Sequence, residues 1–417
     1  MLALAGCTIS PFKAERVHFF DRAHDQRESD AVRVQIFMDA QGDLYPKDGL
    51  PASLRKGTVE AQGDLRWMAD GGSDALCAER GSGSTETDRL CEAVQSDDGW
   101  VSAQAAMWTD RAERIAAEAV SGNGYRPIVM LIHGFNVTDA RPDYGRLRQA
   151  VVDVPMADAP LFVEVNWNGY RRAAFDRAWD EGQGSGPLVG FELRQLLNNL
   201  AASLEGAETL PTVHVLTHSS GAFVAGAMLG NPCHALPNLR DLNRRHGKYA
   251  AFYKNRATTE GLHAVPKGLD IRVGMLAPAT SALTFVESGD CGSEGEGVAD
   301  QRTGLRTEGA VILSSLNTKD RALRKAILPV EMTWIGGATG LGANPAQACE
   351  LAAEAPAGTE VAIYDFTPKK GTAAPSDSHA IATYLAHPVA DMFIRDLLLT
   401  NDPTGAFDGD CASLLAD

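Results

Sequence analysis

The feature that most constrains the fold is an alternation of short apolar runs with stretches of helical spacing. The apolar runs stand at 127–132, 161–165, 212–216, 271–276, 310–316 and 361–364. Helical patterns separate most of them, at 143–152, 188–203, 220–229, 320–327 and 385–399. Apolar strands that alternate with helices form parallel sheets covered on both faces. We therefore predict an α/β fold with a mostly parallel, doubly wound sheet.

Composition excludes several other classes of protein. The chain has 417 residues, of which 44% are hydrophobic, and no short period recurs, so disordered and collagen-like classes are excluded. The sequence contains no run of about 18 apolar residues, so we expect no membrane-spanning helix. Its 38 Lys and Arg against 54 Asp and Glu give a net charge of -16. Such a surface repels phosphate backbones, so we expect no nucleic-acid partner.

Residues 1–30 are interpreted as a truncated signal remnant followed by a tether. The segment Leu4-Ala5-Gly6-Cys7 resembles the processing box of bacterial lipoproteins, in which the cysteine receives the lipid. Only six residues, none of them basic, precede Cys7, whereas a complete signal has a basic region and an apolar region there. The interpretation predicts an exported protein, either a periplasmic or outer-membrane-associated lipoprotein or a secreted one. The alternative is a fortuitous run of small residues.

The remaining cysteines support export. They are even in number and none lies in a C-x-x-C pair, which gives structural zinc no local support, and we predict no metal site. Three disulfides between sequence neighbours are preferred, namely Cys77 with Cys91, Cys233 with Cys291, and Cys349 with Cys411. The alternative is six buried free thiols in a cytosolic protein.

Residues 31–125 are predicted to form an N-terminal part that precedes the core. The alternating segment 32–38 and the turn residues 41–43 favour a hairpin. The stretch 50–97 is rich in Gly, Ser and Asp, and we expect an irregular excursion stapled by a disulfide. Apolar residues from 100 to 120 recur with the period of an amphipathic helix.

Residues 126–417 are predicted to form the core, interrupted by an insertion at 231–269 that is long for an ordinary connection. Within it, seven basic and two acidic residues give a local charge of 7 - 2 = +5 between 240 and 267. Aromatic residues lie among these charges, and we expect them to contact substrate if the insertion covers a functional site as a lid: Tyr249, Phe252 and Tyr253. The alternative is a solvated helical hairpin.

The strongest chemical signal is the segment Thr217-His218-Ser219-Ser220-Gly221, which joins the 212–216 strand to an Ala-rich helix. A nucleophile elbow requires this strand–turn–helix context, and its general pattern is G-x-S-x-G. Here Thr217 replaces the first glycine. We predict that Ser219 is a nucleophile, the alternative being a strand end followed by an ordinary helix N-cap.

A second signal, Ile132-His133-Gly134-Phe135-Asn136, ends the 127–132 strand. Glycine lets the chain turn sharply there and point amides at a ligand. The amides of Phe135 and Ser220 are therefore predicted to form an oxyanion hole. We interpret His133 as a structural residue of the loop rather than as a base.

Together IHGFN at 132–136, EVNWNG at 164–169 and THSSG at 217–221 resemble the α/β-hydrolase fold superfamily, and within it a little-characterised bacterial branch with an HGFN loop and an HS-x-G elbow. The resemblance covers about 126–400. In that fold the triad runs Ser, then Asp or Glu, then His along the chain.

The resemblance assigns the remaining site residues. Asp320 follows the 310–316 strand and would be the acid, the alternative being an N-cap for a helix at 321–327. His379, in a loop after the last strand, would be the base and is favoured over His387. Asn136 and Trp167 are predicted to contact substrate.

The resemblance also implies an activity. A serine-dependent, esterase- or lipase-like hydrolase would cleave a small or polymeric carboxylic ester through an acyl-enzyme, without a cofactor. Two alternatives remain open. One is a catalytically silent α/β-hydrolase scaffold with a binding role at the cell envelope, and the other is an acyltransferase.

Overall fold

The structure is a computed structural model of the chain. It describes residues 33–39, 42–46, 65, 77, 85–94, 96–121, 124–134, 140–167, 175–205, 210–231, 266–286, 304–305, 309–324, 326–327, 330–331, 340–368, 379–400 and 403. Residues 1–30 and most of the insertion at 231–269 therefore lie outside the described residues. Within the described ranges, no helix is both long enough and apolar enough to cross a membrane.

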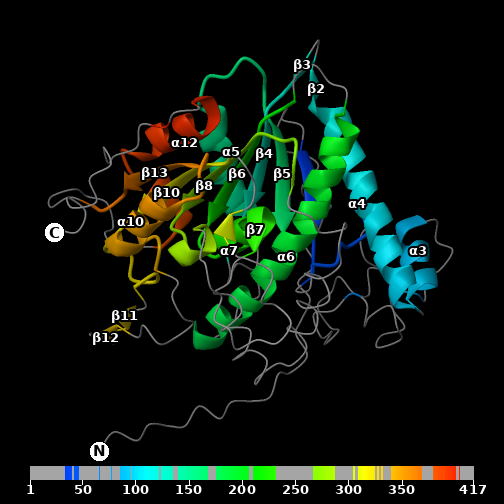
Figure 1. Cartoon of the computed structure of the whole chain (residues 1–417), viewed down its shortest axis with the longest axis horizontal. Helices are drawn as coiled ribbons and strands as arrows, with labels where there is room; N and C mark the ends of the chain where they lie inside the picture. The colour runs from blue at the N-terminus through cyan, green and yellow to red at the C-terminus, as the bar shows by residue number, and fades with distance from the viewer. Residues whose placement is uncertain are drawn as a thin grey trace, which may run out of the picture.

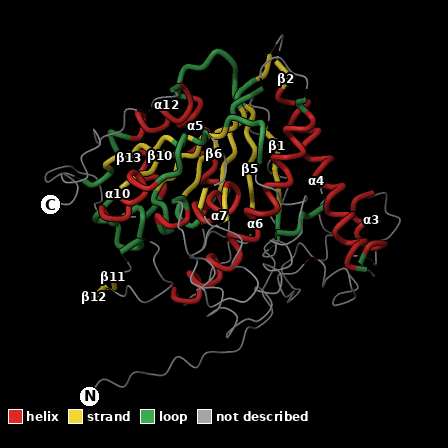
Figure 2. Tube along the Cα trace, viewed as in Figure 1, coloured by secondary structure: helices red, strands yellow, loops and turns green. Residues whose placement is uncertain are grey.

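A parallel sheet of seven strands occupies the centre of the described chain (Figures 1 and 2). In spatial order the strands are β1 (Arg33–Phe37), β5 (Leu161–Asn166), β4 (Ile128–Ile132), β6 (Val213–His218), β8 (Ile271–Leu276), β10 (Val311–Leu316) and β13 (Glu360–Asp365). Every pairing between neighbours is parallel. The six predicted strands and the α/β class are thus confirmed.

Helices cover both faces of this sheet, as parallel strands require. One face packs on α4 (Asp97–Ala119), α6 (Phe175–Ser203), α7 (Gly221–Leu229) and α10 (Pro345–Glu354). The other face packs on α5 (Arg141–Val152), α11 (Ile381–Leu385) and α12 (Ala390–Leu399). Alternate residues of β4 divide between the two cores, with Met130 in the first and Leu131 in the second.

Short elements complete the described structure. Three two-stranded ribbons pair antiparallel: β2 (Val120–Ser121) with β3 (Gly124–Tyr125), β7 (Gly230–Asn231) with β9 (Gly304–Leu305), and β11 (Ala326–Ile327) with β12 (Val330–Glu331). A 3₁₀ turn, η3 (Ala282–Thr284), follows β8.

The part of the chain before the core differs from its prediction in two places. The predicted hairpin is only a turn closed by one antiparallel bridge between Met38 and Leu44, because β1 pairs with β5 instead. The stretch 50–97 is not irregular throughout, since α3 (Thr85–Ala93) packs against α4. The buried ion pair of Arg111 with Glu86 ties these two helices together.

The helix predicted at 320–327 is wrong: residues 321–324 form turns, and β11 begins at Ala326. The helix predicted at 385–399 is two helices, α11 and α12, with Pro388 in the break between them, where its ring and missing N–H oppose a continuous helix. Like α3, the helix α10 has no counterpart among the predictions. Asn344 caps it through its side chain, and Pro345 begins it.

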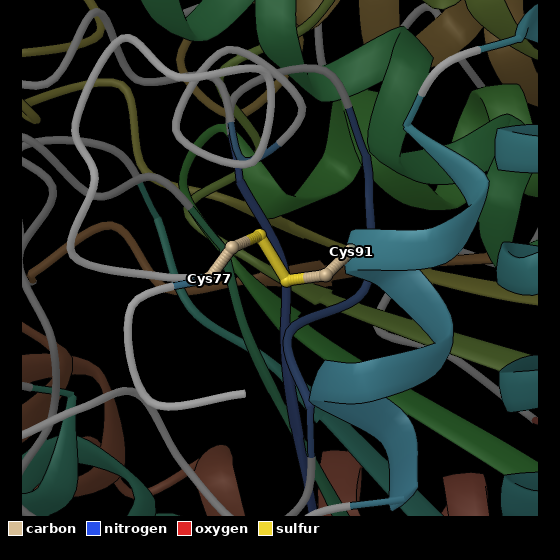
Figure 3. The surroundings of a disulfide bond; sticks show 2 residues. All are labelled: Cys77 and Cys91. Carbon is tan, nitrogen blue, oxygen red and sulfur yellow. A yellow bond between two sulfur atoms is a disulfide. The ribbon is translucent and has the colours of Figure 1, made fainter. Parts of the chain in front are cut away.

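One predicted disulfide is present among the described residues. Cys77 is bonded to Cys91 on α3, with their Cα atoms 5.7 Å apart (Figure 3). Cys349 on α10 is also disulfide-bonded. Its predicted partner Cys411 lies outside the described residues, as do Cys7, Cys233 and Cys291.

Candidate active site

The candidate site is built around a strained turn between β6 and α7. Ser219 has φ +55°, a left-handed conformation that residues other than glycine adopt only when their surroundings enforce it. The segment after β8 supplies that enforcement. The Ser219 amide donates to the Leu276 carbonyl at 3.0 Å, and the Ala279 amide donates to the Ser219 carbonyl at 3.1 Å. The turn therefore fixes the direction of the Ser219 side chain.

Two glycines make room for this turn. A Cβ atom on Gly134 would stand 2.6 Å from the Cβ of Ser219, and one on Gly221 would stand 2.7 Å from the carbonyl oxygen of Ile132. Neither position tolerates a side chain without movement of the backbone around Ser219. Thr217, which replaces the first glycine of the elbow pattern, is fully buried and fits beside Gly221.

Three predicted residues from distant parts of the chain meet at this turn. The Nε2 atom of His379 lies 2.7 Å from Ser219 Oγ, and its Nδ1 atom lies 2.8 Å from Asp320 Oδ2. Each of the three follows the carboxyl end of a strand: Ser219 after β6, Asp320 after β10, and His379 after β13. The hydrogen bond to the carboxylate requires a proton on Nδ1, which leaves Nε2 as an acceptor for the serine hydroxyl. The arrangement is thus suited to removing a proton from Ser219.

The alternative base, His387, does not reach the turn. Its ring packs against Phe366 at a centroid distance of 5.1 Å, and its Nδ1 accepts from the Val389 amide. Of the two histidines, His379 is the one that contacts Ser219 and Asp320.

Asp320 is fully buried and has hydrogen bonds on both oxygens. Oδ1 accepts from the amides of Ala322 and Leu323 at 3.0 and 3.1 Å, so the carboxylate also caps the turn that follows it. Oδ2 accepts from His379 and from the hydroxyl of Tyr384 at 2.7 Å. Burial alone would raise the pKa of Asp320, but interaction with His379 and these hydrogen bonds outweigh it and the pKa is lowered. The carboxylate therefore stays ionised although it is fully buried.

Two other histidines support the site in their neutral form. His218 Nε2 lies 2.9 Å from the carbonyl oxygen of His379, so Nε2 must donate. Burial, followed by the proximity of His379, lowers the pKa of His218 to about 3. His133 Nδ1 donates to the Gly134 carbonyl at 2.6 Å, and burial lowers the His133 pKa to about 4. His133 contacts its own loop and Trp167, and its structural role stays a prediction.

Trp167 packs against that histidine. The two rings stack at a centroid distance of 5.7 Å, and Trp167 Nε1 donates to the His133 carbonyl at 2.9 Å. The indole is 1% exposed. Trp167 therefore holds the loop that contains His133, and its contact with substrate stays a prediction.

Several predicted site residues lie outside the described residues, namely Phe135, Asn136, Tyr249, Phe252 and Tyr253. Ser220, the other predicted oxyanion residue, is buried and stands at the N-cap of α7. The amides at a helix N-terminus have no partner within the helix and carry its positive dipole end, which suits a developing negative charge.

Two residues of the site were not predicted from the sequence. Tyr384 contacts Asp320, and His218 contacts His379. Nothing marks Tyr384 in the sequence except its place five residues after His379. His218 adjoins Ser219, but its bond to the main chain of His379 depends on the packing of the last segment against the elbow.

Comparison with the models of known protein families finds no match to this chain, and no curated protein matches it either. The class that the structure defines is an α/β protein with a parallel sheet, and its described residues hold a connected Ser–His–Asp arrangement at the carboxyl edge of that sheet.

Proposed function

We propose that the chain is a serine hydrolase of the α/β-hydrolase fold that cleaves carboxylic esters. The observation that carries the proposal is the hydrogen-bonded path from Ser219 Oγ through His379 to Asp320, with both contacts between 2.7 and 2.8 Å. The order Ser, Asp, His along the chain and the left-handed Ser219 at a strand–helix elbow give it independent support.

The proposed reaction follows from these contacts. His379 takes the hydroxyl proton of Ser219 as Oγ attacks the ester carbonyl, and the amides of Phe135 and Ser220 hold the oxyanion. The tetrahedral intermediate breaks its bond to the alcohol, which receives the proton from His379. Water, deprotonated by the same imidazole, then hydrolyses the acyl-enzyme. Asp320 holds the imidazole in its tautomer and stabilises the imidazolium throughout.

A silent scaffold is the weaker alternative because the arrangement is costly. A non-glycine residue in the left-handed region costs about 1–2 kcal/mol, and a fully buried carboxylate requires partners for its charge. A binding role would use neither feature. An acyltransferase would share every step except the final acceptor.

Export is part of the proposal. The Cys77–Cys91 disulfide supports it, because disulfides persist in oxidising compartments such as the periplasm. The lipid anchor on Cys7 and the lid at 231–269 stay predictions.

The test is hydrolysis of a short p-nitrophenyl ester by the full chain and by two serine variants. Ser219→Ala should lower kcat by about 10⁴- to 10⁶-fold. Ser203→Ala is the matched control, since Ser203 is exposed on α6 and its hydroxyl donates to the Asn199 carbonyl of the same helix at 2.8 Å. Comparable hydrolysis by both variants would refute the proposed nucleophile.

A further inference from the structure

We propose that Tyr384 is a positioning residue of this site, whose hydroxyl holds the Asp320 carboxylate in place and ionised through a direct hydrogen bond. The inference rests on the proposed function, since it concerns the acid of the proposed triad. It extends the hydrogen-bonded path by one residue beyond Asp320.

The position of the hydroxyl carries the proposal. Tyr384 OH donates to Asp320 Oδ2 at 2.7 Å, and this is the same oxygen that His379 Nδ1 approaches at 2.8 Å. The other oxygen, Oδ1, is occupied by two backbone amides. Among the described residues, Tyr384 is thus the side chain, other than His379 itself, that forms a hydrogen bond with the oxygen facing the base.

The direction of this hydrogen bond is fixed by a second buried side chain. Asn317 forms a side-chain hydrogen bond with Tyr384. This contact lowers the pKa of Tyr384, which is the effect of an NH₂ group that donates to the tyrosine oxygen, while Asn317 Oδ1 accepts from the Lys319 amide at 3.1 Å. The tyrosine oxygen therefore accepts from Asn317, and its own proton points to Asp320.

The ring that carries the hydroxyl is held rigidly. Tyr384 lies on α11, is 1% exposed, and packs against Phe366 at a ring-centroid distance of 5.5 Å. Both residues belong to the core on the α5, α11 and α12 face of the sheet. A hydroxyl fixed by core packing can hold a carboxylate within the narrow tolerance that catalysis requires.

The charge balance explains why such a donor is needed. In the resting state the base must be neutral to accept a proton, so the buried charge of Asp320 has no full cation beside it. The titratable side chains that face Asp320 are His379, Tyr384 and His218, whereas the cationic side chains of its own turn are exposed, namely Lys319, Arg321 and Arg324. The negative charge of Asp320 is therefore stabilised by hydrogen bonds from neutral donors. Burial and the charge of Asp320 raise the pKa of Tyr384 well above its usual value, so the hydroxyl keeps its proton.

The test compares two tyrosine-to-phenylalanine variants. Tyr384→Phe removes the hydroxyl and keeps the ring. Tyr364→Phe is the matched control, because Tyr364 lies in the same core and donates to the carboxylate of Asp396 at 2.5 Å, outside the proposed triad. For each protein we would measure kcat and KM for p-nitrophenyl acetate from pH 5 to 9, and the rate of labelling by a fluorophosphonate over the same range.

Tyr384→Phe should lower kcat about tenfold with KM within about twofold, because a hydrogen bond to a charged group is lost. A carboxylate with one donor fewer is a stronger base, so the His379–Asp320 pair takes up a proton at higher pH. The acid limbs of hydrolysis and of labelling should both move up by about 0.5–1 pH unit. In an Asp320→Asn background the same change should alter kcat by less than about twofold.

Each outcome has one meaning. Unchanged acid limbs in Tyr384→Phe, or equal effects of Tyr384→Phe and Tyr364→Phe, would overturn the inference and leave the proposed function standing. A wild-type protein that neither hydrolyses nor labels would overturn the proposed function. If Tyr384→Phe does not fold, Asn317→Ala, which weakens the same donor, must shift the acid limbs in the same direction, and no shift would overturn the inference.

Discussion

We expect the folded protein to lose stability when the pH falls below about 6.5, because three of its histidines are buried in their neutral form. His133 and His214 are each 2% exposed and His218 is 7% exposed. Burial is the main cause that lowers their pKa values from 6.5, to about 4 for His133 and His214 and to about 3 for His218. All three are neutral in the folded protein near pH 7, and each is held by hydrogen bonds that its neutral ring satisfies.

The sign of the effect follows from proton uptake. Between about pH 4 and 6.5 these side chains are protonated in the unfolded chain but not in the folded one. The unfolded state therefore binds more protons, and the contribution of these three histidines to the free energy of unfolding rises with pH across this window and is constant above it. The lowered pKa of Asp320 acts below its ordinary value of 3.8 and so lies outside the window.

Each unit of pH below 6.5 costs about 1.4 kcal/mol per histidine, so pH 5 costs about 2 kcal/mol for each and about 6 kcal/mol for the three. That loss is comparable to the whole stability of many proteins. Urea unfolding followed by circular dichroism at pH 5 to 8, without reductant, measures it.

His214→Asn provides a matched variant for this assay. His214 Nδ1 lies 2.9 Å from the Leu397 carbonyl, and an asparagine amide can donate there without titrating. This variant should lose about 2 kcal/mol less than the wild type between pH 7.5 and 5. A free energy of unfolding that stays constant over that range would refute the assignment of buried neutral histidines.

Two further predictions concern backbone space and the disulfide. Gly134→Ala should lower kcat/KM for an ester at least about 100-fold, because the new Cβ would stand 2.6 Å from the Cβ of Ser219. The control Gly145→Ala on α5 should change kcat/KM less than about twofold. Equal activities of the two variants would contradict the close approach of Gly134 to Ser219. Replacing both Cys77 and Cys91 by Ala should lower the free energy of unfolding by about 3 kcal/mol, as expected for a loop of about 15 residues, and a change below about 0.5 kcal/mol in urea unfolding would contradict a structural role for this bond.

The strands could be predicted because strands buried on both faces are rich in apolar residues. Every residue of β4, β5, β6, β8 and β10 is buried, and apolar residues make up half or more of each of these strands. Amphipathic helices such as α5 were also visible, since their buried residues recur at helical spacing.

The predictions that were wrong concern segments whose structure depends on residues far away in the sequence. The turn at 321–324 has helical composition, but the Asp320 carboxylate takes the amides of Ala322 and Leu323 while its other oxygen faces His379, and the chain turns away. The first strand pairs with β5 over 120 residues away rather than with its neighbouring turn, and no local pattern specifies that choice.

The residues of the candidate site also differ in how far the sequence predicts them. Ser219 and Gly134 carry local signals, because a strained turn needs small residues around it. Asp320 and His379 were predicted from the resemblance to the α/β-hydrolase fold, and their contact depends on the parallel sheet. Tyr384 and His218 could not be predicted, since each contributes through one hydrogen bond that exists only after the last helices pack on the sheet.

The central claim is that Ser219 is an activated nucleophile, and a fluorophosphonate tests it most directly. The full chain would be incubated with the reagent, and intact mass and peptide mapping would give the number and position of phosphonyl groups. We expect one group per chain on Ser219 and none in Ser219→Ala. Labelling should be slowed at least about 100-fold in His379→Ala, because the base that lies 2.7 Å from the hydroxyl is gone. A group on any other residue, or full-rate labelling without His379, would contradict this claim.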